Sequence, residues 1–214
     1  TMINHTPDVK EKLQKLGLVV LTEQSSSEPE ALGRVEWIKL FGVLFDKEDE
    51  AAHLFNEQKA RVEQTSGLAS SGKTVAYFYI NSNGAAVTRR AGDYVAQMIE
   101  LAGGKNAAEE ITDTYWAEIS YEQLLAWDPA YIILASDADY TVDDILNDEN
   151  LKDCTAVKNG QVYQIPGDVE ALDSPVPASI LASVWLAGIL HPEQIPADTY
   201  TTESNTYYET FYGI

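Results

Sequence analysis

Two adjacent arginines, Arg89 and Arg90, lie in the stretch GAAVTRRAGDYVAQMIELAGG, between a candidate strand and a candidate helix. A guanidinium is planar, permanently charged and able to hold an anion through two parallel hydrogen bonds. The pattern therefore favours at least one guanidinium that faces a cleft and pairs with an anionic ligand. The alternative is a salt bridge to a nearby acid such as Asp93, a common surface interaction that is worth little energy.

Two further stretches carry candidate ligand contacts. Trp116, in DTYWAEIS, is predicted to lie in a loop before a capped helix, where it stacks on a ligand or covers the core. Asp168, Glu170 and Asp173, in GDVEALDSP, are able to hydrogen-bond a ligand. The alternative is a solvated loop in which Asp173 or Ser174 caps a helix that begins at residues 175–177.

Known catalytic and metal-binding motifs are not found in the sequence. It contains no GxSxG elbow, P-loop, GxGxxG or HExxH pattern. Cys154 has no histidine near it in sequence, and His5, His53 and His191 lie far apart without metal-ligand spacing. These observations disfavour an enzyme and a structural zinc site, and a single cysteine excludes an intrachain disulfide. No cofactor and no metal ligands are predicted.

The composition is that of an acidic globular chain. Its 214 residues are 45% hydrophobic, and 14 Lys and Arg against 34 Asp and Glu give a formal charge of −20. Such a charge repels nucleic acid and anionic membranes, so neither is expected as a partner. No apolar run of about 18 residues is present that could cross a bilayer. The opening TMINHTPDVKEKLQKLGLVVLTEQ reads as a polar helix leading into an apolar strand, so we expect upstream sequence to be missing.

A long helical periodicity runs from Glu28 to Thr65 and is interrupted at Asp46. We predict two helices joined at FDKEDE, with Asp46 as the cap of the second. Together they could cover roughly 50 Å at 1.5 Å per residue, a length that suits a spine between two lobes. An ordinary pair of core helices is the alternative.

Beyond TSGLASSGK, strand and helix patterns alternate. Strands are predicted at 74–80, 131–135 and 161–165, separated by helices of 8 to 14 residues, which indicates an α/β fold with a mainly parallel sheet and helices on both faces. Ligands of such sheets bind beyond the carboxyl ends of the strands. This rule selects the loops 81–90, 136–140 and 166–176. The tyrosine-rich tail YTTESNTYYETFYGI is expected to pack back onto the body.

Several motifs occur in an order typical of one family: GKTVAYFYI, VTRRAGDYVAQMIELAGGKNAAEE, WAEISYEQLLAWDPAYIIL, LKDCTAVKNGQVYQIPGD and DSPVPASILASVWLAGILHPE. From about Val19 onward the chain resembles the C-terminal lobe of substrate-binding proteins of ATP-driven importers for iron–siderophore, haem and cobalamin. The resemblance implies two α/β lobes joined by a long rigid helix, with the ligand between them. It divides the chain into a remnant of the N-terminal lobe (1–29), a connecting helix region (30–66), the C-terminal α/β lobe (72–190) and a tail (191–214).

The resemblance also implies roles for particular residues. Glu122 matches a surface glutamate that docks onto arginines of the membrane permease. Trp116 matches an aromatic site beside the ligand, the first cleft loop runs from Tyr79 through Arg90, and the last from Asp168 to Asp173. The predicted ligand-binding residues are Tyr79, Asn81, Thr88, Arg89, Arg90, Trp116, Asp168, Glu170 and Asp173.

The resulting prediction is an extracytoplasmic binding component of an ABC importer, periplasmic or lipid-anchored through a segment absent from this chain. A ferric siderophore is the preferred ligand, with Arg89 or Arg90 offsetting the negative charge of the chelate. Cobalamin is the main rival; haem is less favoured, because no ligating Tyr/His pair can be placed. A small α/β enzyme and an acidic docking domain remain as other classes. A lobe without its partner exposes apolar surface, so self-association is expected.

Overall fold

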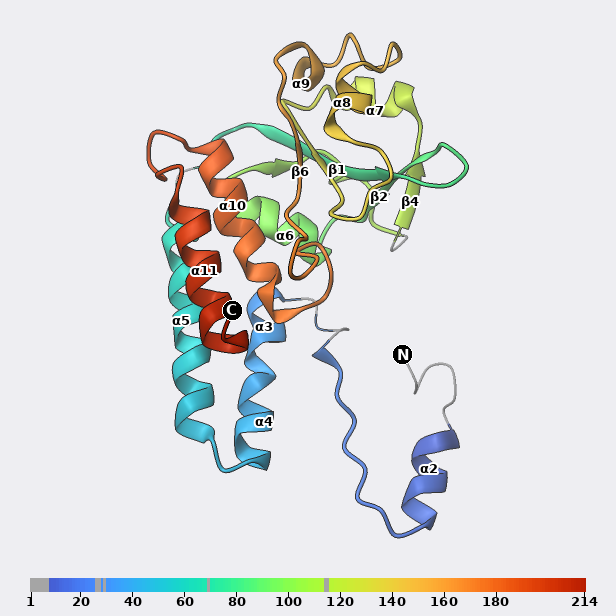
Figure 1. Ribbon diagram of the computed structural model, residues 1–214. Helices are drawn as coiled ribbons and strands as arrows, with labels where there is room; N and C mark the ends of the chain where they lie inside the picture. Colours follow the sequence, from blue (N-terminus) through green and yellow to red (C-terminus); the bar gives the residue numbers. More distant parts are fainter. Residues whose placement is uncertain (1–7, 26–27, 29, 69, 114–115) are drawn as a thin grey trace.

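The computed structural model describes residues 8–25, 28, 30–68, 70–113 and 116–214. It places a twisted sheet with its helices in one part of the molecule and a bundle of longer helices beside it (Figure 1). The order across the sheet is β4-β2-β1-β5-β6, with β3 paired to β1. The strands are β1 (Thr74–Ile80), β2 (Ala86–Arg89), β3 (Lys105–Asn106), β4 (Trp116–Ile119), β5 (Tyr131–Leu134) and β6 (Val162–Gln164).

The sheet is mixed, with a parallel part and an antiparallel part. Strands β3, β1, β5 and β6 run parallel, whereas β2 is antiparallel to β1 and β4 is antiparallel to β2. The α/β fold with helices on both faces is confirmed, and the antiparallel strands are an addition to the expected parallel sheet. The crossovers between parallel strands carry helices on both faces, and a further helix after the last strand adds to one of them.

Two segments expected to be loops are strands. Residues 86–89 turn back on β1 as a hairpin, and Trp116 begins β4 rather than lying in a loop. The turn closes because the Asn81 side chain accepts hydrogen bonds from the backbone of Asn83 and Ala85, at 2.9 and 3.0 Å. Gly84 follows with φ +79°, a conformation that favours glycine. The Asn83-Gly84 pair therefore lies in a hairpin turn and not in an open loop.

The central parallel strands β1 and β5 are buried on both faces, as is usual when helices cover a sheet on both sides. Alternate side chains of β1 point to opposite faces of the sheet and belong to two separate hydrophobic clusters. Val75 and Tyr77 pack with Met98 on one face, while Phe78 packs with Leu124 on the other. The covering helices are α6 (Tyr94–Leu101) and α10 (Leu181–Leu190) on the first face, with α7 (Tyr121–Trp127), α8 (Val142–Leu146) and α9 (Thr155–Lys158) on the second.

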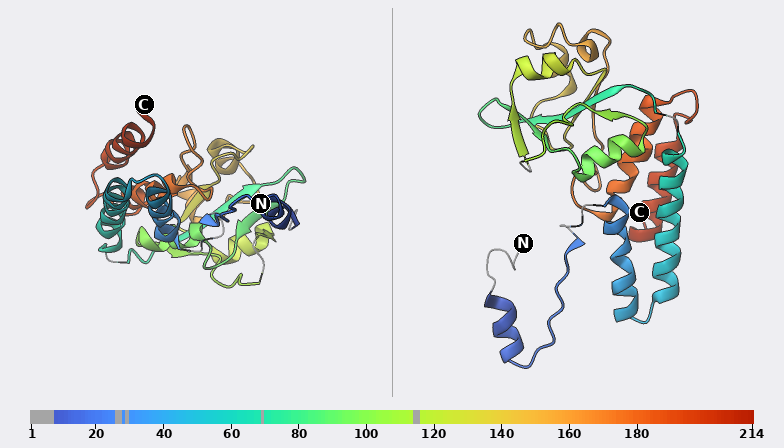
Figure 2. Two further views of the ribbon diagram at one scale, coloured as in Figure 1. Left: turned by 90° about the horizontal axis from the view of Figure 1, so that it is seen from below. Right: turned by 180° about the vertical axis from the view of Figure 1, so that it is seen from behind.

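The helical pattern at 28–65 forms an antiparallel hairpin and does not reach the summed length of about 50 Å. It contains α3 (Ala31–Glu36), α4 (Ile38–Leu44) and α5 (Glu48–Ser66), and α4 lies beside α5 in both views (Figures 1 and 2). The helices break near Asp46 as predicted, but Asp46 is not a cap, because its φ of +54° reverses the chain. Their lengths therefore do not add, and α5 alone, with 19 residues, spans about 28 Å.

The tail forms α11 (Thr199–Tyr212), which packs beside α10 and α5 (Figure 1). Tyr207 and Tyr208 are buried in this contact. The Arg61 guanidinium on α5 pairs with the Glu203 carboxylate on α11 at 2.6 Å. At the other end of the chain, α2 (Asp8–Lys15) and the extended residues after it lie apart from the body (Figure 2). None of the described helices is long and apolar enough to cross a membrane.

Candidate functional site

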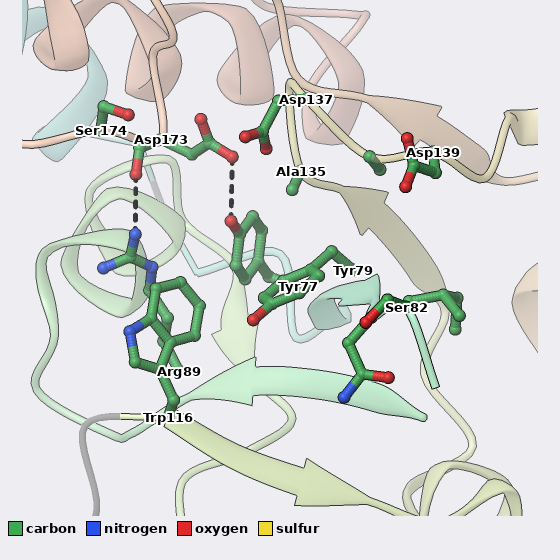
Figure 3. A pocket seen from close by; sticks show the side chains of 13 residues that line it. Tyr77, Tyr79, Ser82, Arg89, Trp116, Ala135, Asp137, Asp139, Asp173 and Ser174 are labelled. Carbon is green, nitrogen blue, oxygen red and sulfur yellow. Dashed lines mark hydrogen bonds between the residues drawn. The ribbon is translucent and has the colours of Figure 1, made fainter. Parts of the chain in front are cut away.

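A hollow of about 470 Å³ lies beyond the carboxyl ends of β1 and β5, where the sheet topology predicts ligand binding (Figure 3). We call it the sheet-end hollow. It is lined by β1 and the hairpin turn, by the loop after β5, by the loop before α10 and by the antiparallel strands. In that order, the described lining residues are Tyr77, Tyr79, Ile80, Asn81 and Ser82; Ala135, Asp137, Ala138 and Asp139; Asp173 and Ser174; and Arg89 and Trp116. All three loops selected from the sequence thus contribute to it.

Arg89, the last residue of β2, lies under the hollow with its charge already paired. Its Nη2 donates to the carbonyl oxygen of Asp173 at 3.1 Å, and its Nη1 lies 3.5 Å from the Asp93 carboxylate. The guanidinium carbon also lies 4.0 Å from the centre of the Trp116 ring, and the side chain is only 12% exposed. The salt bridge to Asp93 that the sequence offered as an alternative is therefore present, at a residue that also lines the hollow.

Asp173 joins three segments of the site through its carboxylate. Its Oδ2 accepts from the Tyr77 hydroxyl and from the Ser136 backbone N–H, each at 2.9 Å, while Oδ1 accepts from the Ser136 hydroxyl at 2.6 Å. The capping alternative for Asp173 and Ser174 is wrong: the 3₁₀ helix η2 (Pro177–Ile180) has Val176 at its N-cap and no side-chain cap bond. The tertiary fold uses this carboxylate to fasten the last cleft loop to β1 and β5.

Two tyrosines beside these charges remain protonated. Burial, with a further contribution from the Asp173 carboxylate, raises the pKa of Tyr77 well above its usual value. Burial likewise raises the pKa of Tyr94. Tyr77 therefore keeps its hydroxyl hydrogen and remains a donor to Asp173 across the physiological pH range.

An aromatic wall borders the hollow. The rings of Tyr79 and Trp116 meet edge to face with centroids 5.5 Å apart, and Trp116 is 42% exposed. Both residues were predicted ligand contacts, and both line the hollow. Such a wall offers flat apolar surface to an organic ligand. Asn81 also lines the hollow, and its amide donates to the Glu118 carboxylate at 3.2 Å.

A row of cations and aromatic rings leads from the aromatic wall to the helical bundle. The Arg89 guanidinium lies over Trp116 on one side and within 4.6 Å of the Tyr94 ring centre on α6. The Arg34 guanidinium on α3 lies 3.8 Å from the same ring centre. Cation–π contacts between desolvated groups are worth about 2 kcal/mol each. The row ties β2, β4, α6 and α3 together behind the hollow.

The remaining predicted ligand residues lie elsewhere. Thr88 is buried and donates its hydroxyl to the Tyr77 carbonyl at 2.7 Å, across the hairpin. Arg90 is not among the described residues that line the hollow. Asp168 and Glu170 lie near tyrosines of α11, since their charges contribute to the raised pKa of Tyr200 and Tyr208. Each of these pKa values rises chiefly because of burial.

Sequence reasoning did not single out several residues of the site. Tyr77 and Ser136 hold Asp173, while Asp137 and Asp139 line the hollow after β5. The strand-end rule selected their loop, but no motif distinguished these side chains within it. Gly167 also matters, because a Cβ there would lie 2.7 Å from the Ser136 Cβ and push the last cleft loop away.

Two findings bear on chemistry and docking. Among the described residues, no cluster of three or more His, Cys, Asp or Glu side chains could hold a metal ion.

Glu122, the predicted docking residue, is exposed in the first turn of α7. Hydrogen bonds from its own backbone N–H and from the Ser120 side chain lower the pKa of Glu122, so it is ionised at neutral pH.

Comparison with known families gives a direct match. The model of the periplasmic binding protein family matches residues 2–169, most of the chain. The chain belongs to this family. The predicted resemblance is thus confirmed at the level of the family, as is the extracytoplasmic location.

Relatives of this chain support the same assignment. The molybdate-binding protein MolA of Haemophilus influenzae is 29% identical over 185 residues, which cover 84% of this chain and 52% of MolA. An uncharacterised lipoprotein of Methanocaldococcus jannaschii is 26% identical over 91% of this chain and 49% of its own length. The chain therefore spans about half the length of the curated relatives that it matches.

Solved structures agree in fold. A periplasmic solute-binding protein from Veillonella parvula superposes with a TM-score of 0.77 at 25% identity, covering 99% of this chain and 64% of that chain. The structure of Haemophilus influenzae MolA bound to molybdate gives a TM-score of 0.67 at 27% identity, over 86% of this chain and 57% of MolA.

Proposed function

We propose that the protein is the substrate-binding component of an ABC importer, which captures a metal chelate at the sheet-end hollow and delivers it to a permease. The observation that carries this proposal is the aromatic wall of Tyr79 and Trp116 beside a strand-end hollow, in a chain of the periplasmic binding protein family. The relatives that match include a molybdate-binding protein and a periplasmic solute-binding protein, which supports a binding function.

The lining also argues against catalysis. Its described residues include no histidine, the most common general base, and the two serines, Ser82 and Ser174, have no histidine or lysine among the lining residues to activate them. The buried carboxylate of Asp173 already accepts three hydrogen bonds. Such a site is arranged to hold a ligand and not to transform it.

The size and chemistry of the hollow favour an organic chelate. Ligand pockets for small organic molecules typically measure about 300–1,000 Å³ and combine apolar walls with a few polar groups. The sheet-end hollow, at about 470 Å³, has this character. A ferric siderophore, in which an organic ligand surrounds the metal, is the ligand we propose.

Within this proposal the chain supplies one side of a two-lobe receptor. Residues 72–190 form one lobe, residues 30–66 belong to the connection, and a second lobe completes the ligand site from the opposite side. The coverage of about half of each curated relative supports this division. Cobalamin or haem could occupy the same kind of site, with the aromatic wall as the main contact.

Molybdate is a second candidate, because MolA is 29% identical to this chain. A small dianion needs several hydrogen-bond donors that converge on it. Arg89 is the only basic side chain among the described lining residues, and two of its nitrogens already face Asp93 and the Asp173 carbonyl. The wall formed by this chain is therefore better suited to an organic chelate than to a bare oxyanion.

Glu122 is the proposed contact to the permease. Its ionised carboxylate is exposed on α7, available to arginines of a partner. Replacement of Glu122 by Lys should leave ligand affinity unchanged and reduce import at least tenfold, because an attractive pair becomes a repulsive one. The matched control is Glu149→Lys, which makes the same charge change at another exposed position. Unchanged import by the Glu122 variant would contradict the proposal that this residue contacts the permease.

The function is tested by equilibrium dialysis of the protein against ferric siderophores, haem, cobalamin and molybdate, with metal analysis of both compartments. Tryptophan fluorescence is recorded in parallel for the native protein and for Trp116→Phe, with Trp127→Phe as the control. Saturable binding of a ferric chelate, with quenching that falls in the Trp116 variant alone, supports the proposal. Binding of molybdate alone would favour the second candidate, and binding of none of the ligands would contradict the receptor function.

A further inference from the structure

The charge of the sheet-end hollow differs from what the paired arginines of the sequence suggest. Its described lining contains three aspartates, Asp137, Asp139 and Asp173, and one basic residue, Arg89. The wall is therefore acidic on balance, although the sequence led to the expectation of a site for anions. The charge that a ligand experiences from each of these side chains depends on whether neighbouring groups already compensate that side chain.

The positive charge of Arg89 is compensated inside the protein. The Asp93 carboxylate, 3.5 Å from Nη1, is 1% exposed, so this pair is shielded from solvent and cancels locally. The Asp173 carbonyl accepts a hydrogen bond from Nη2. The Trp116 indole covers the guanidinium, whose carbon lies 4.0 Å from the ring centre (Figure 3). A ligand in the hollow thus meets the indole and not a free guanidinium. Arg89 acts as a positioning residue for Trp116.

The negative charges fall into two kinds. The carboxylate of Asp173 accepts hydrogen bonds from Tyr77 and Ser136, which hold it in place and spread its charge. Asp137 and Asp139, on the loop after β5, are both exposed. In the part of the chain that the structure describes, neither has a hydrogen-bond or ion-pair partner. Their full charges are therefore open to whatever enters the hollow.

Two uncompensated carboxylates beside an aromatic wall select against anions. Like charges repel, and this repulsion strengthens as a ligand displaces water from between them. A cationic group, in contrast, gains hydrogen-bonded ion pairs with the same carboxylates. The aromatic wall accepts the organic part of the ligand in either case.

We infer that the hollow selects metal chelates that carry no net negative charge, and in particular ferric hydroxamate complexes with a protonated amine. This inference rests on the proposed function and specifies its ligand. In a tris-hydroxamate complex three singly charged groups balance ferric iron, so an amine makes the whole complex a cation. A tris-catecholate complex keeps a triple negative charge. The amine contacts Asp137 and Asp139 while the chelate core lies on Trp116.

The test uses probes matched in size. The protein is titrated with a linear ferric tris-hydroxamate that bears a free amine, with the same complex after acetylation of the amine, with a ferric tris-catecholate and with molybdate. We expect the amine complex to bind about tenfold more tightly than its acetylated form, and the two anions to bind more weakly than both. The preference should shrink as salt is added, because the two carboxylates are exposed.

The double variant Asp137→Asn, Asp139→Asn removes the inferred contact and should abolish the preference for the amine. The matched control is Glu149→Gln with Asp153→Asn, which removes the same formal charge from surface pairs outside the hollow and should retain the preference. Tighter binding of the catecholate or of molybdate, or a preference that survives in the first variant, would overturn the inference and leave the receptor function standing. Binding of none of the probes would instead overturn the receptor function, and the inference with it.

Discussion

The sheet-end hollow and the free end of the helical hairpin differ in which side chains they bury and which they expose. Around the hollow, charged groups such as Arg89, Asp93 and Asp173 are largely buried and paired. At the free end of α4, four large apolar residues are exposed, which we call the hairpin tip: Phe41, Val43, Leu44 and Phe45. Phe45, for example, is 71% exposed.

The two surfaces differ in whether their side chains already have partners within the chain. Buried charges cost free energy unless each has a partner, so a network like that of Asp173 is fixed before ligand arrives. A cluster of exposed apolar side chains, in contrast, leaves hydrophobic surface in water and marks a contact site. We therefore expect the first surface to bind a small molecule and the second to bind protein.

The largest effect is expected at Asp173. Replacement by Ala leaves the Tyr77 hydroxyl and both Ser136 donors without their acceptor, and should lower the free energy of unfolding by about 3–5 kcal/mol. Urea unfolding followed by circular dichroism measures this loss. Asp168→Ala, at an exposed position of the same loop, is the control and should change stability by less than about 0.5 kcal/mol. A loss below about 1 kcal/mol at Asp173 would contradict the fastening role.

A smaller effect is expected where α5 meets α11. The Arg61 and Glu203 side chains are 8% and 25% exposed, so their ion pair is only partly screened. Arg61→Met should cost about 2 kcal/mol, because Glu203 keeps a partly desolvated charge without its partner. A double-mutant cycle with Glu203→Gln measures the coupling. Simple additivity of the two single changes would show that the pair contributes packing and not charge.

The hairpin tip should affect association more than folding. Phe41→Ser with Phe45→Ser should weaken self-association of the chain while changing its unfolding free energy by no more than about 1 kcal/mol, since both side chains are already exposed. Light scattering over a range of concentrations measures the mass. A native chain that stays monomeric at every concentration would contradict the role of the tip.

The smallest effect is expected at the start of α8, where Thr141 and Asp144 form a capping box. Hydrogen bonds from the Thr141 backbone and hydroxyl lower the pKa of Asp144 below its usual value. A carboxyl group whose pKa is lowered by folding stabilises the folded state above its unfolded pKa, and this contribution is lost as pH falls through the folded pKa. Asp144→Asn should therefore lower Tm slightly at neutral pH, and the difference should disappear in acid. An equal difference at both pH values would exclude ionisation as the cause.

Local patterns predicted much of the secondary structure. The β-branched and aromatic run TVAYFYI forms β1, and Ser120 caps α7 by accepting from the Gln123 N–H at 3.1 Å. The break near Asp46 was visible as well. Each of these features depends on residues within a few positions of one another, and such interactions can be inferred from the order of side-chain types alone.

The sequence by itself determined the family, the α/β order of strands and helices, and which loops reach the carboxyl edge of the sheet. The tertiary structure decided how those loops use their side chains. Asp173 meets Tyr77, 96 positions earlier in the chain, and the charge of Arg89 is compensated by Asp93 and covered by Trp116. The reason is physical: capping and periodicity act over one or two turns of chain, whereas the partners of a buried charge are chosen by the packing of distant segments.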